Sequence, residues 1–339
     1  MISQWKECDM KGKKILMFGP DFFGYREKIA EELMAMGAQV DLYDERPSNS
    51  AFCKIMLRSN LKLYRPVVTK YYRQVIAENR GKDYDYVFVI KSEGINEKIF
   101  TMLRQAFPKA KFILYLWDSV ENVPDGERKL ALYDRVLTFD HVDAKAYNLP
   151  LRPLFCCKEY SAQPESQESY RYDAAFIGTA HSIRPRVVRQ VSKICEDQGG
   201  QIFAFLFLPH KLVYYYHKLT NPAYRGIRRQ DIHFDALTAE EIRAVYDQSR
   251  CILDVEHCAQ RGLTMRTIEM MGMGKKLITT NTGIQNYDFY HPNNICVIDR
   301  KNPRIPKDFW TSPYVPVPGS ILQRYSLRAF VEDIFDVKE

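Results

Sequence analysis

The chain has 339 residues, of which 46% are hydrophobic and 27% charged, so the composition predicts a globular protein with a sizeable core and about two domains. No stretch is apolar for long enough to cross a membrane, the N-terminus lacks the apolar segment of an export signal, and the 8 cysteines show no CxxC spacing. We therefore expect a protein of the reducing cytoplasm.

The formal net charge of +7 is unevenly distributed. Residues 52–82 carry eight Lys and Arg and a single acid, Glu78, and residues 203–229 carry five Lys and Arg and no acid. Both segments interleave aromatic and basic side chains, a pattern that suits phosphate-rich partners such as nucleic acid, anionic lipid or phosphorylated small molecules. The alternative is a solvated basic face over the apolar underside of a helix.

In the first half of the chain, short apolar runs alternate with amphipathic stretches. This alternation predicts a mostly parallel sheet with helices on both faces. The expected strands are 13–19, 38–47, 84–91, 111–118 and 134–140. The expected helices are 25–37, 95–107 and 127–133.

Residues 161–171 are polar, contain proline and lack an apolar period, so we interpret them as a linker between domains. The alternation then resumes, and a capping box from Thr238 to Glu241 marks one helix start. The expected strands are 172–178, 201–208, 250–256, 275–281 and 294–299. The expected helices are 184–197, 238–249, one starting near Thr264, and one amphipathic helix over 320–339. The predicted domains are 1–160 and 172–310, followed by a tail, 311–339, that we expect to pack back on the first domain.

Ligands of open α/β sheets bind outside the carboxyl ends of the strands, so polar residues at those positions are the candidates for a site. The sequence has no dinucleotide fingerprint, P-loop, nucleophile elbow or metal-ligand spacing, so it gives no indication of a cofactor or a metal. The string Asp83-Tyr84-Asp85 precedes its strand and therefore lies at the wrong edge for a ligand.

Three clusters meet the criterion. The first, FIGTAHSIR (176–184), offers a glycine and side-chain donors for a phosphate. In the second, GLTMRTIEMMGMGKKLITTN (262–281), a helix N-terminus and Arg266 favour a diphosphate, with Glu269 one turn further on. The alternative there is a surface ion pair between Arg266 and Glu269 over a methionine-rich core. In the third, IKSEG and LWDSVEN place carboxylates at two strand ends of the first domain.

Together the second-domain motifs resemble GT-B glycosyltransferases, and in particular the CgeB-like group associated with lipopolysaccharide and capsule synthesis. The resemblance rests on FIGTAHSIR, LTAEEIRAVYDQSRCILDVE and GLTMRTIEMMGMGKKLITTNTG, which cover most of 172–283. It implies two Rossmann-like domains that face a cleft. It also implies a metal-independent, cytoplasmic enzyme that transfers a sugar from a nucleotide-sugar donor to a glycan or lipid-linked hydroxyl acceptor.

By the same resemblance, Glu269 would meet the ribose of the donor, and the region of Gly262 and Arg266 its diphosphate. The full set of expected donor-binding residues is Gly178, Thr179, His181, Arg184, His257, Gly262, Arg266, Glu269 and Asn281.

Many retaining members carry a second glutamate eight positions before the equivalent of Glu269, where this chain has Arg261. If the enzyme instead inverts, a general base must come from elsewhere, and the candidates are Asp118, Glu93 and Asp21.

The resemblance also suggests that segment 52–82 contacts anionic lipid at the inner face of the cell membrane. Two other interpretations of the chain stay open. One is a non-catalytic GT-B-like partner of a polysaccharide assembly complex. The other is a basic nucleic-acid-binding protein, which we do not expect because no helix-turn-helix, RRM or zinc-finger signature is present.

Overall fold

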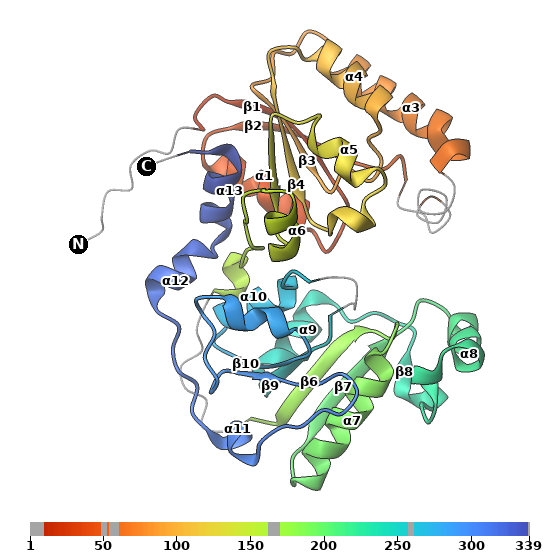
Figure 1. The fold of residues 1–339 in the computed structure, drawn as a ribbon, viewed down its shortest axis with the longest axis vertical. Helices are drawn as coiled ribbons and strands as arrows, with labels where there is room; N and C mark the ends of the chain where they lie inside the picture. Colours follow the sequence, from red (N-terminus) through yellow and green to blue (C-terminus); the bar gives the residue numbers. More distant parts are fainter. Residues whose placement is uncertain (1–9, 49–52, 54–60, 162–169, 257–260, 338–339) are drawn as a thin grey trace. The chain divides into compact units, whose positions relative to one another are not determined.

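The computed structural model describes residues 10–48, 53, 61–161, 170–256 and 261–337. The chain divides into two compact α/β units (Figure 1). The first is built from 1–155 together with 260–262 and 325–339, and the second from 156–259 and 263–324. Most of the predicted linker, 162–169, lies outside the described residues.

The first unit contains a five-stranded parallel sheet in the order β2-β1-β3-β4-β5. Its strands are β1 Lys14–Gly19, β2 Gln39–Asp44, β3 Tyr86–Ile90, β4 Lys111–Leu116 and β5 Arg135–Thr138. All five were predicted. Four of them are buried at every position after the first residue, and nearly all of those positions are apolar, as expected for parallel strands that are covered on both faces.

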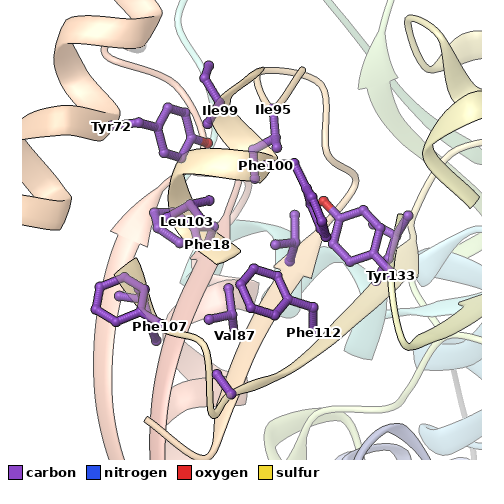
Figure 2. Close-up of a cluster of buried hydrophobic side chains, with 14 of the residues drawn as sticks. Phe18, Tyr72, Val87, Ile95, Ile99, Phe100, Leu103, Phe107, Phe112 and Tyr133 are labelled. Atoms are coloured by element: carbon purple, nitrogen blue, oxygen red, sulfur yellow. The ribbon is translucent and has the colours of Figure 1, made fainter. Parts of the chain in front are cut away.

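Helices pack against both faces of this sheet. One face forms a core with α3 (Leu61–Glu78) and α4 (Glu97–Ala106), in which Tyr72 and Leu103 pack against Phe18 and Phe112 (Figure 2). On the other face, Phe330 of the C-terminal helix contacts Tyr115. The helices of this unit are α1 Tyr25–Ala35, α3 Leu61–Glu78, α4 Glu97–Ala106, α5 Gly126–Leu130, α6 His141–Ala146 and α13 Leu327–Phe335, with a 3-10 turn, η1, at Val120–Asn122.

Helix α3 carries much of the basic segment 52–82. Its residues Val68, Tyr72 and Val75 are buried on the sheet, while Lys70 and Arg73 are exposed. In its described part the segment is therefore a helix with an apolar underside and a basic face exposed to solvent. This is the alternative to a surface for a phosphate-rich partner.

The second unit contains a six-stranded parallel sheet in the order β11-β10-β9-β6-β7-β8. Its strands are β6 Tyr172–Thr179, β7 Ile202–Phe207, β8 Ile232–His233, β9 Ser249–Asp254, β10 Lys276–Thr279 and β11 Ile295–Val297. The two-residue edge strand β8 was not predicted. The others lie within a residue or two of the expected ranges.

The helices predicted at 184–197, at 238–249 and near Thr264 begin within one residue of their expected starts, whereas those at Lys211–Thr220 and Lys307–Thr311 were not predicted. Thr238 forms the expected capping box with Glu241, and Thr264 caps the helix that carries Arg266. The helices are α7 Arg184–Asp197, α8 Lys211–Thr220, α9 Ala239–Asp247, α10 Met265–Gly272, α11 Lys307–Thr311 and α12 Gly319–Arg324. The 3-10 turns are η2 Lys158–Tyr160, η3 Pro222–Tyr224, η4 Arg229–Asp231 and η5 Thr282–Asn286.

The prediction of one helix over 320–339 is wrong. Helix α12 ends at Arg324, and α13 begins anew at Leu327 because the Ser326 hydroxyl caps it by accepting from the Ala329 N–H at 3.1 Å. Helix α13 contacts α1 and β4, and Arg152 forms an ion pair with Asp333 at 2.9 Å. Residues 325–339 thus belong to the first unit, whereas α12 belongs to the second.

Candidate functional site

Each sheet has one topological switch point. There the chain stops adding strands on one side of the first strand and begins to add them on its other side. In the second sheet β7 and β8 lie on one side of β6, and β9 to β11 lie on the other, so the switch falls between β6 and β9. In the first sheet it falls between β1 and β3. Ligands of doubly wound folds bind at the carboxyl ends of the strands that flank such a point.

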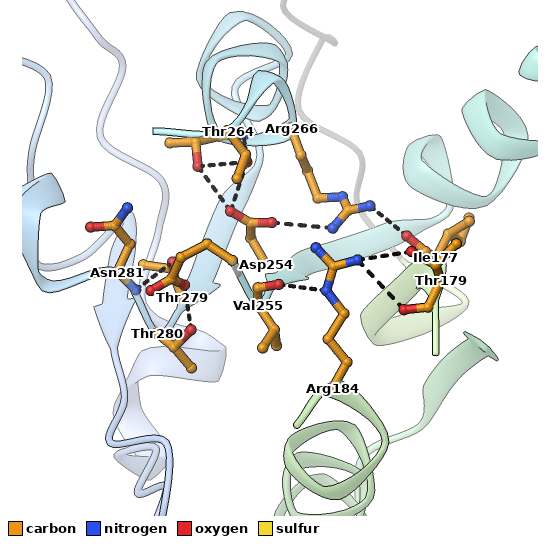
Figure 3. A network of polar contacts seen from close by, with 12 residues as sticks. Ile177, Thr179, Arg184, Asp254, Val255, Thr264, Arg266, Thr279, Thr280 and Asn281 are labelled. Atoms are coloured by element: carbon orange, nitrogen blue, oxygen red, sulfur yellow. Dashed lines mark hydrogen bonds and ion pairs between the residues drawn. The ribbon is translucent and has the colours of Figure 1, made fainter. Parts of the chain in front are cut away.

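The buried carboxylate of Asp254 organises the switch point of the second sheet (Figure 3). Asp254 is the last residue of β9 and is 1% exposed. One of its oxygens accepts from Arg266 Nη1 at 3.1 Å, and the other accepts from the hydroxyls of Thr264 and Thr267 at 2.8 and 3.1 Å. Because Thr264 is the N-cap of α10, this single carboxylate fixes where that helix begins.

Arg266 has a protein partner at each of its three guanidinium nitrogens. Besides Asp254, it donates to the Tyr246 hydroxyl at 3.2 Å and to the Ile177 carbonyl of β6 at 2.5 Å. Burial by itself would lower the pKa of Arg266, but Tyr246 and Asp254 outweigh it and raise the pKa. In this arrangement Arg266 links β6, β9, α9 and α10, and its described ion pair is with Asp254.

Arg184, the first residue of α7, presents a guanidinium with unused donor capacity. Its Nε donates to the Val255 carbonyl at 2.7 Å and its Nη1 to the Thr179 hydroxyl at 3.1 Å. Among the described residues, its Nη2 has no hydrogen-bond partner. Burial and the nearby charge of Arg266 lower the pKa of Arg184 to about 10, because its positive charge is incompletely compensated. A ligand with a negative charge would supply that compensation.

A second buried carboxylate, Glu256, lies two residues beyond β9. It accepts from the Thr280 hydroxyl and forms an ion pair with Arg300. Burial raises the pKa of Glu256. Asn281, one of the expected donor-binding residues, follows β10 and caps η5 by accepting from the Gly283 N–H at 2.9 Å. Its side chain is therefore used to shape the loop at this edge.

Glu269 lies on the buried side of α10. It is 6% exposed, and its charge raises the pKa values of Cys156 and Tyr160, after the larger effect of burial. Gly272, on the same helix, allows close packing, because an added Cβ would lie 2.3 Å from Cys156 Sγ. The methionines Met270 and Met271 are buried core residues, as the sequence pattern predicts.

The other expected donor-binding residues divide into three groups. Gly178 and Thr179 lie at the end of β6 beside Arg184 and Arg266, since a Cβ on Gly178 would be 3.5 Å from Arg266 Nη2. His181 follows them in the turn before α7. Gly262 groups with the first unit, where an added Cβ would come within 2.4 Å of the Phe139 ring, so close packing explains this glycine. The remaining residue, His257, lies outside the described residues.

The switch point of the first sheet holds a buried cluster of opposite charges. Arg46 donates to Glu93 at 2.5 Å and lies 3.8 Å from Glu45, whose other carboxylate oxygen accepts from the Glu93 N–H at 2.9 Å. Burial raises the pKa of Glu45 to about 7. Glu45 is completely buried, and within the described part of the chain its Oε1 has no hydrogen-bond partner.

Lys91 joins this cluster to Asp118. Its ammonium lies 3.7 Å from Glu93 and 3.4 Å from Asp118, so two of the three candidate bases share one cation. Lys91 and Ser92 both have positive φ, 75° and 62°, a strained conformation for side-chain-bearing residues that is typical of functional sites. The third candidate, Asp21, is exposed in the loop after β1.

Several residues of these two networks were absent from the expected set. They are Asp254, Glu256 and Arg300 in the second unit, and Glu45, Arg46 and Lys91 in the first. Two of the six, Lys91 and Glu256, lie at strand ends, where the sequence places candidate site residues, although they were given no role. For Asp254 the signal was an acid inside an apolar run, RCILDVE. Within the part of the chain that the structure describes, no three His, Cys, Asp or Glu side chains are grouped so as to hold a metal ion. Nor does any described helix combine the length and the apolar character that a membrane span requires.

Comparisons with known proteins address the fold. By sequence, no family model and no curated protein matches this chain. By structure, it is similar to OtsA at TM-score 0.68 and 9% identity, covering 97% of this chain and 99% of that one. It is also similar to the sucrose-phosphate synthase of Thermosynechococcus elongatus at TM-score 0.62 and 10% identity, covering 96% and 98%.

A third similar structure is Anabaena HepE in complex with UDP and glucose, at TM-score 0.58 and 11% identity, with 96% and 98% of the two chains covered. These likenesses extend over nearly the whole chain at very low identity, so they concern the fold. The chain has the two parallel-sheet α/β domains of GT-B glycosyltransferases, which confirms the predicted fold class.

We predict that Asp254→Ala destabilises the protein by about 3 to 5 kcal/mol, because it leaves Arg266, whose side chain is only 19% exposed, without its counter-charge. Asp247→Ala is the matched control, since its 3.0 Å ion pair with Arg243 is partly exposed and should be worth less than about 1 kcal/mol. Urea unfolding of the two variants measures the difference. Equal losses of stability would contradict the organising role of Asp254.

We also predict that Glu45 makes stability depend on pH. Its pKa is raised from an ordinary value of 4.5 to about 7 in the folded protein. As the pH rises, the unfolded chain therefore loses this proton at a lower pH than the folded protein. Folding therefore becomes less favourable as pH rises from about 4.5 to about 7, by roughly 3 kcal/mol. The variant Glu45→Gln should gain stability over the native protein across that window, as measured by urea unfolding at several pH values.

The matched control is Glu31→Gln, at an exposed position on α1. Its free energy of unfolding should stay parallel to that of the native protein at every pH. If the free energy of unfolding of Glu45→Gln also changed with pH in parallel with that of the native protein, Glu45 would not hold a proton in this window.

Proposed function

We propose that this chain is a glycosyltransferase that moves a sugar from a nucleotide-sugar donor to a hydroxyl acceptor. The observation that carries the proposal is Arg184, a cation at the carboxyl edge of the second sheet whose Nη2 has no hydrogen-bond partner among the described residues. The fold supports it, because similar structures include HepE bound to UDP and to UDP-glucose.

The donor diphosphate binds beside Arg184 in this proposal. A guanidinium can donate two hydrogen bonds to a phosphate, and Thr179 and the N-terminal turn of α7 lie next to it. Arg266 acts indirectly, since its three nitrogens hold β6 and α10 in place. Glu269 remains the proposed acceptor for the ribose hydroxyls, and its burial would give that contact a low-dielectric surrounding.

The chemical step transfers the anomeric carbon. Its bond to the donor phosphate oxygen breaks as a bond to the acceptor oxygen forms, and the acceptor hydroxyl loses its proton to a base. We assign that base to Asp118, whose side chain is 16% exposed, against 5% for the more enclosed Glu93. The negative charge that develops on the departing nucleoside diphosphate is stabilised by Arg184.

The biological setting that we propose is the synthesis of a surface polysaccharide or glycoconjugate by a CgeB-like enzyme in the cytoplasm. The acceptor is a glycan or a lipid-linked glycan. The reaction uses no metal and no cofactor besides the donor. The exposed Lys70 and Arg73 on α3 would give segment 52–82 an auxiliary electrostatic contact with the inner face of the cell membrane.

We predict that UDP binds the protein and that Arg184→Gln weakens this binding by about 10- to 100-fold, as expected for the loss of a charge-assisted contact. Lys193→Gln, an exposed cation further along α7, is the matched control and should leave the dissociation constant unchanged. Calorimetric titration gives both constants. A thermal-shift panel of UDP, GDP, CMP and dTDP compounds that produces no shift would refute the donor site.

We further predict that Asp118→Asn lowers kcat for sugar transfer or donor hydrolysis by about 100-fold or more, while the dissociation constant for UDP is retained. The control is Asp83→Asn, an exposed acid before β3 at the opposite edge of the first sheet. Asp21→Asn tests the rival base. If UDP binds the native protein but no donor turns over, the chain is a non-catalytic GT-B-like partner instead.

A further inference from the structure

Helix α8 presents a row of large apolar side chains to solvent. Leu212, Tyr215, Tyr216 and Leu219 are 70%, 55%, 63% and 88% exposed. Their spacing of three, four and seven residues places all four on one face of the helix. Among the described residues, nine large hydrophobic side chains are exposed, and four of them lie on this ten-residue helix. Such a concentration marks an interaction surface.

The opposite face fastens α8 to its domain. Tyr214 is buried in the core and donates to the Ile227 carbonyl at 3.2 Å. His217 stacks on Tyr224 with ring centroids 5.2 Å apart, and the Lys218 ammonium donates to the Ile227 carbonyl at 2.7 Å. The helix is thus held in one orientation, with its apolar row turned outward. Figure 1 shows it at the margin of the second unit, beyond β7 and β8.

The surroundings of the row are positively charged. From residue 203 to 229 the chain has five Lys and Arg and no acid, and the next acid, Asp231, forms an ion pair with Arg228 at 3.1 Å. Lys211 and Arg225 are exposed. A partner for this surface must therefore accept apolar side chains and carry negative charge.

We propose that α8 is an interfacial anchor that lies flat on an anionic membrane. Its leucines would enter the boundary between headgroups and acyl chains, and its basic neighbours would meet lipid phosphates. The tyrosines suit this depth because each combines an apolar ring with a polar hydroxyl. A helix of ten residues is too short to cross a bilayer, so it lies along the surface.

The two basic-aromatic segments differ in one decisive respect. In α3 the aromatic side chain of Tyr72 is completely buried, whereas in α8 Tyr215 and Tyr216 are exposed beside the leucines of the row. Helix α8 offers a membrane four large exposed apolar side chains together with charge, whereas the described part of α3 offers charge with the single exposed Val67. The structure therefore places the anchor on α8 of the second unit.

The test is co-sedimentation of the full chain with lipid vesicles at low salt. We expect binding to phosphatidylcholine vesicles that contain about one third phosphatidylglycerol to exceed binding to pure phosphatidylcholine by about tenfold or more. The double variant Leu212→Ser with Leu219→Ser should lose about tenfold in binding to the anionic vesicles. The matched control, Met34→Ser with Val67→Ser, removes two exposed apolar side chains of the first unit and should bind like the native protein.

Charge reversals separate the two helices. Lys211→Glu with Arg225→Glu should abolish binding to anionic vesicles, and Lys70→Glu with Arg73→Glu on α3 should leave it largely intact. The proposal is overturned if the native protein ignores anionic vesicles at low salt, or if the α3 variant loses binding and the α8 variants do not. It is also overturned if the native protein forms a dimer that the leucine variant cannot form, since a second copy would then cover the row.

This inference is independent of the proposed activity. UDP binding should be equal in the native protein and the α8 variants, because α8 makes no part of the proposed donor site. Failure of vesicle binding therefore removes the anchor only, and failure of UDP binding removes the transferase only.

Discussion

The buried ion pair between Asp254 and Arg266 is the interaction on which the edge of the second sheet depends. A carboxylate that is 1% exposed needs partners for both oxygens, and it obtains them from Arg266 and from the hydroxyls of Thr264 and Thr267. Arg266 in turn holds the end of β6. The positions of α10 and of the β6 loop follow from this one pair, and Arg184 is left with a nitrogen for a ligand.

The first unit also has charged side chains at the switch point of its sheet, but they are arranged differently. Its switch point also gathers charges, where Glu93 forms ion pairs with Arg46 and Lys91 and Glu45 lies 3.8 Å from Arg46. Two consecutive residues with positive φ, Lys91 and Ser92, turn the chain there at a conformational cost. Such a cluster sets the orientation of Asp118 through Lys91. The two sheets differ in strand order, although each gathers charged side chains at its switch point. Among the described residues, one edge holds Arg184 with an unpartnered Nη2, and the other holds ion pairs of Glu93 with Arg46 and Lys91.

Much of the fold was predictable because it depends on local patterns. The range of α7, 184–197, was predicted to the residue, since Pro185 sits in its first turn and Val187, Val188 and Val191 repeat on one face. The caps Thr238 and Thr264 were equally visible. The break between α12 and α13 was missed, because the apolar period continues across Ser326 and only the cap interrupts it. The role of Gly262 was also beyond reach, since the Phe139 ring that it contacts is distant in the chain.

The sequence by itself determined the two parallel-sheet domains, the helix starts and the edges at which polar residues collect, because these follow from apolar periodicity, capping and the rule for strand ends. The sequence did not distinguish the role of Arg184 from that of Arg266. Nor did it distinguish between the two basic-aromatic segments. Only the tertiary structure decided between them. Each guanidinium nitrogen of Arg266 has a protein partner, whereas Nη2 of Arg184 has none within the described residues. Tyr72 of α3 is buried, whereas Tyr215 and Tyr216 of α8 are exposed to solvent. Both outcomes depend on which distant groups pack nearby, and no local pattern records that.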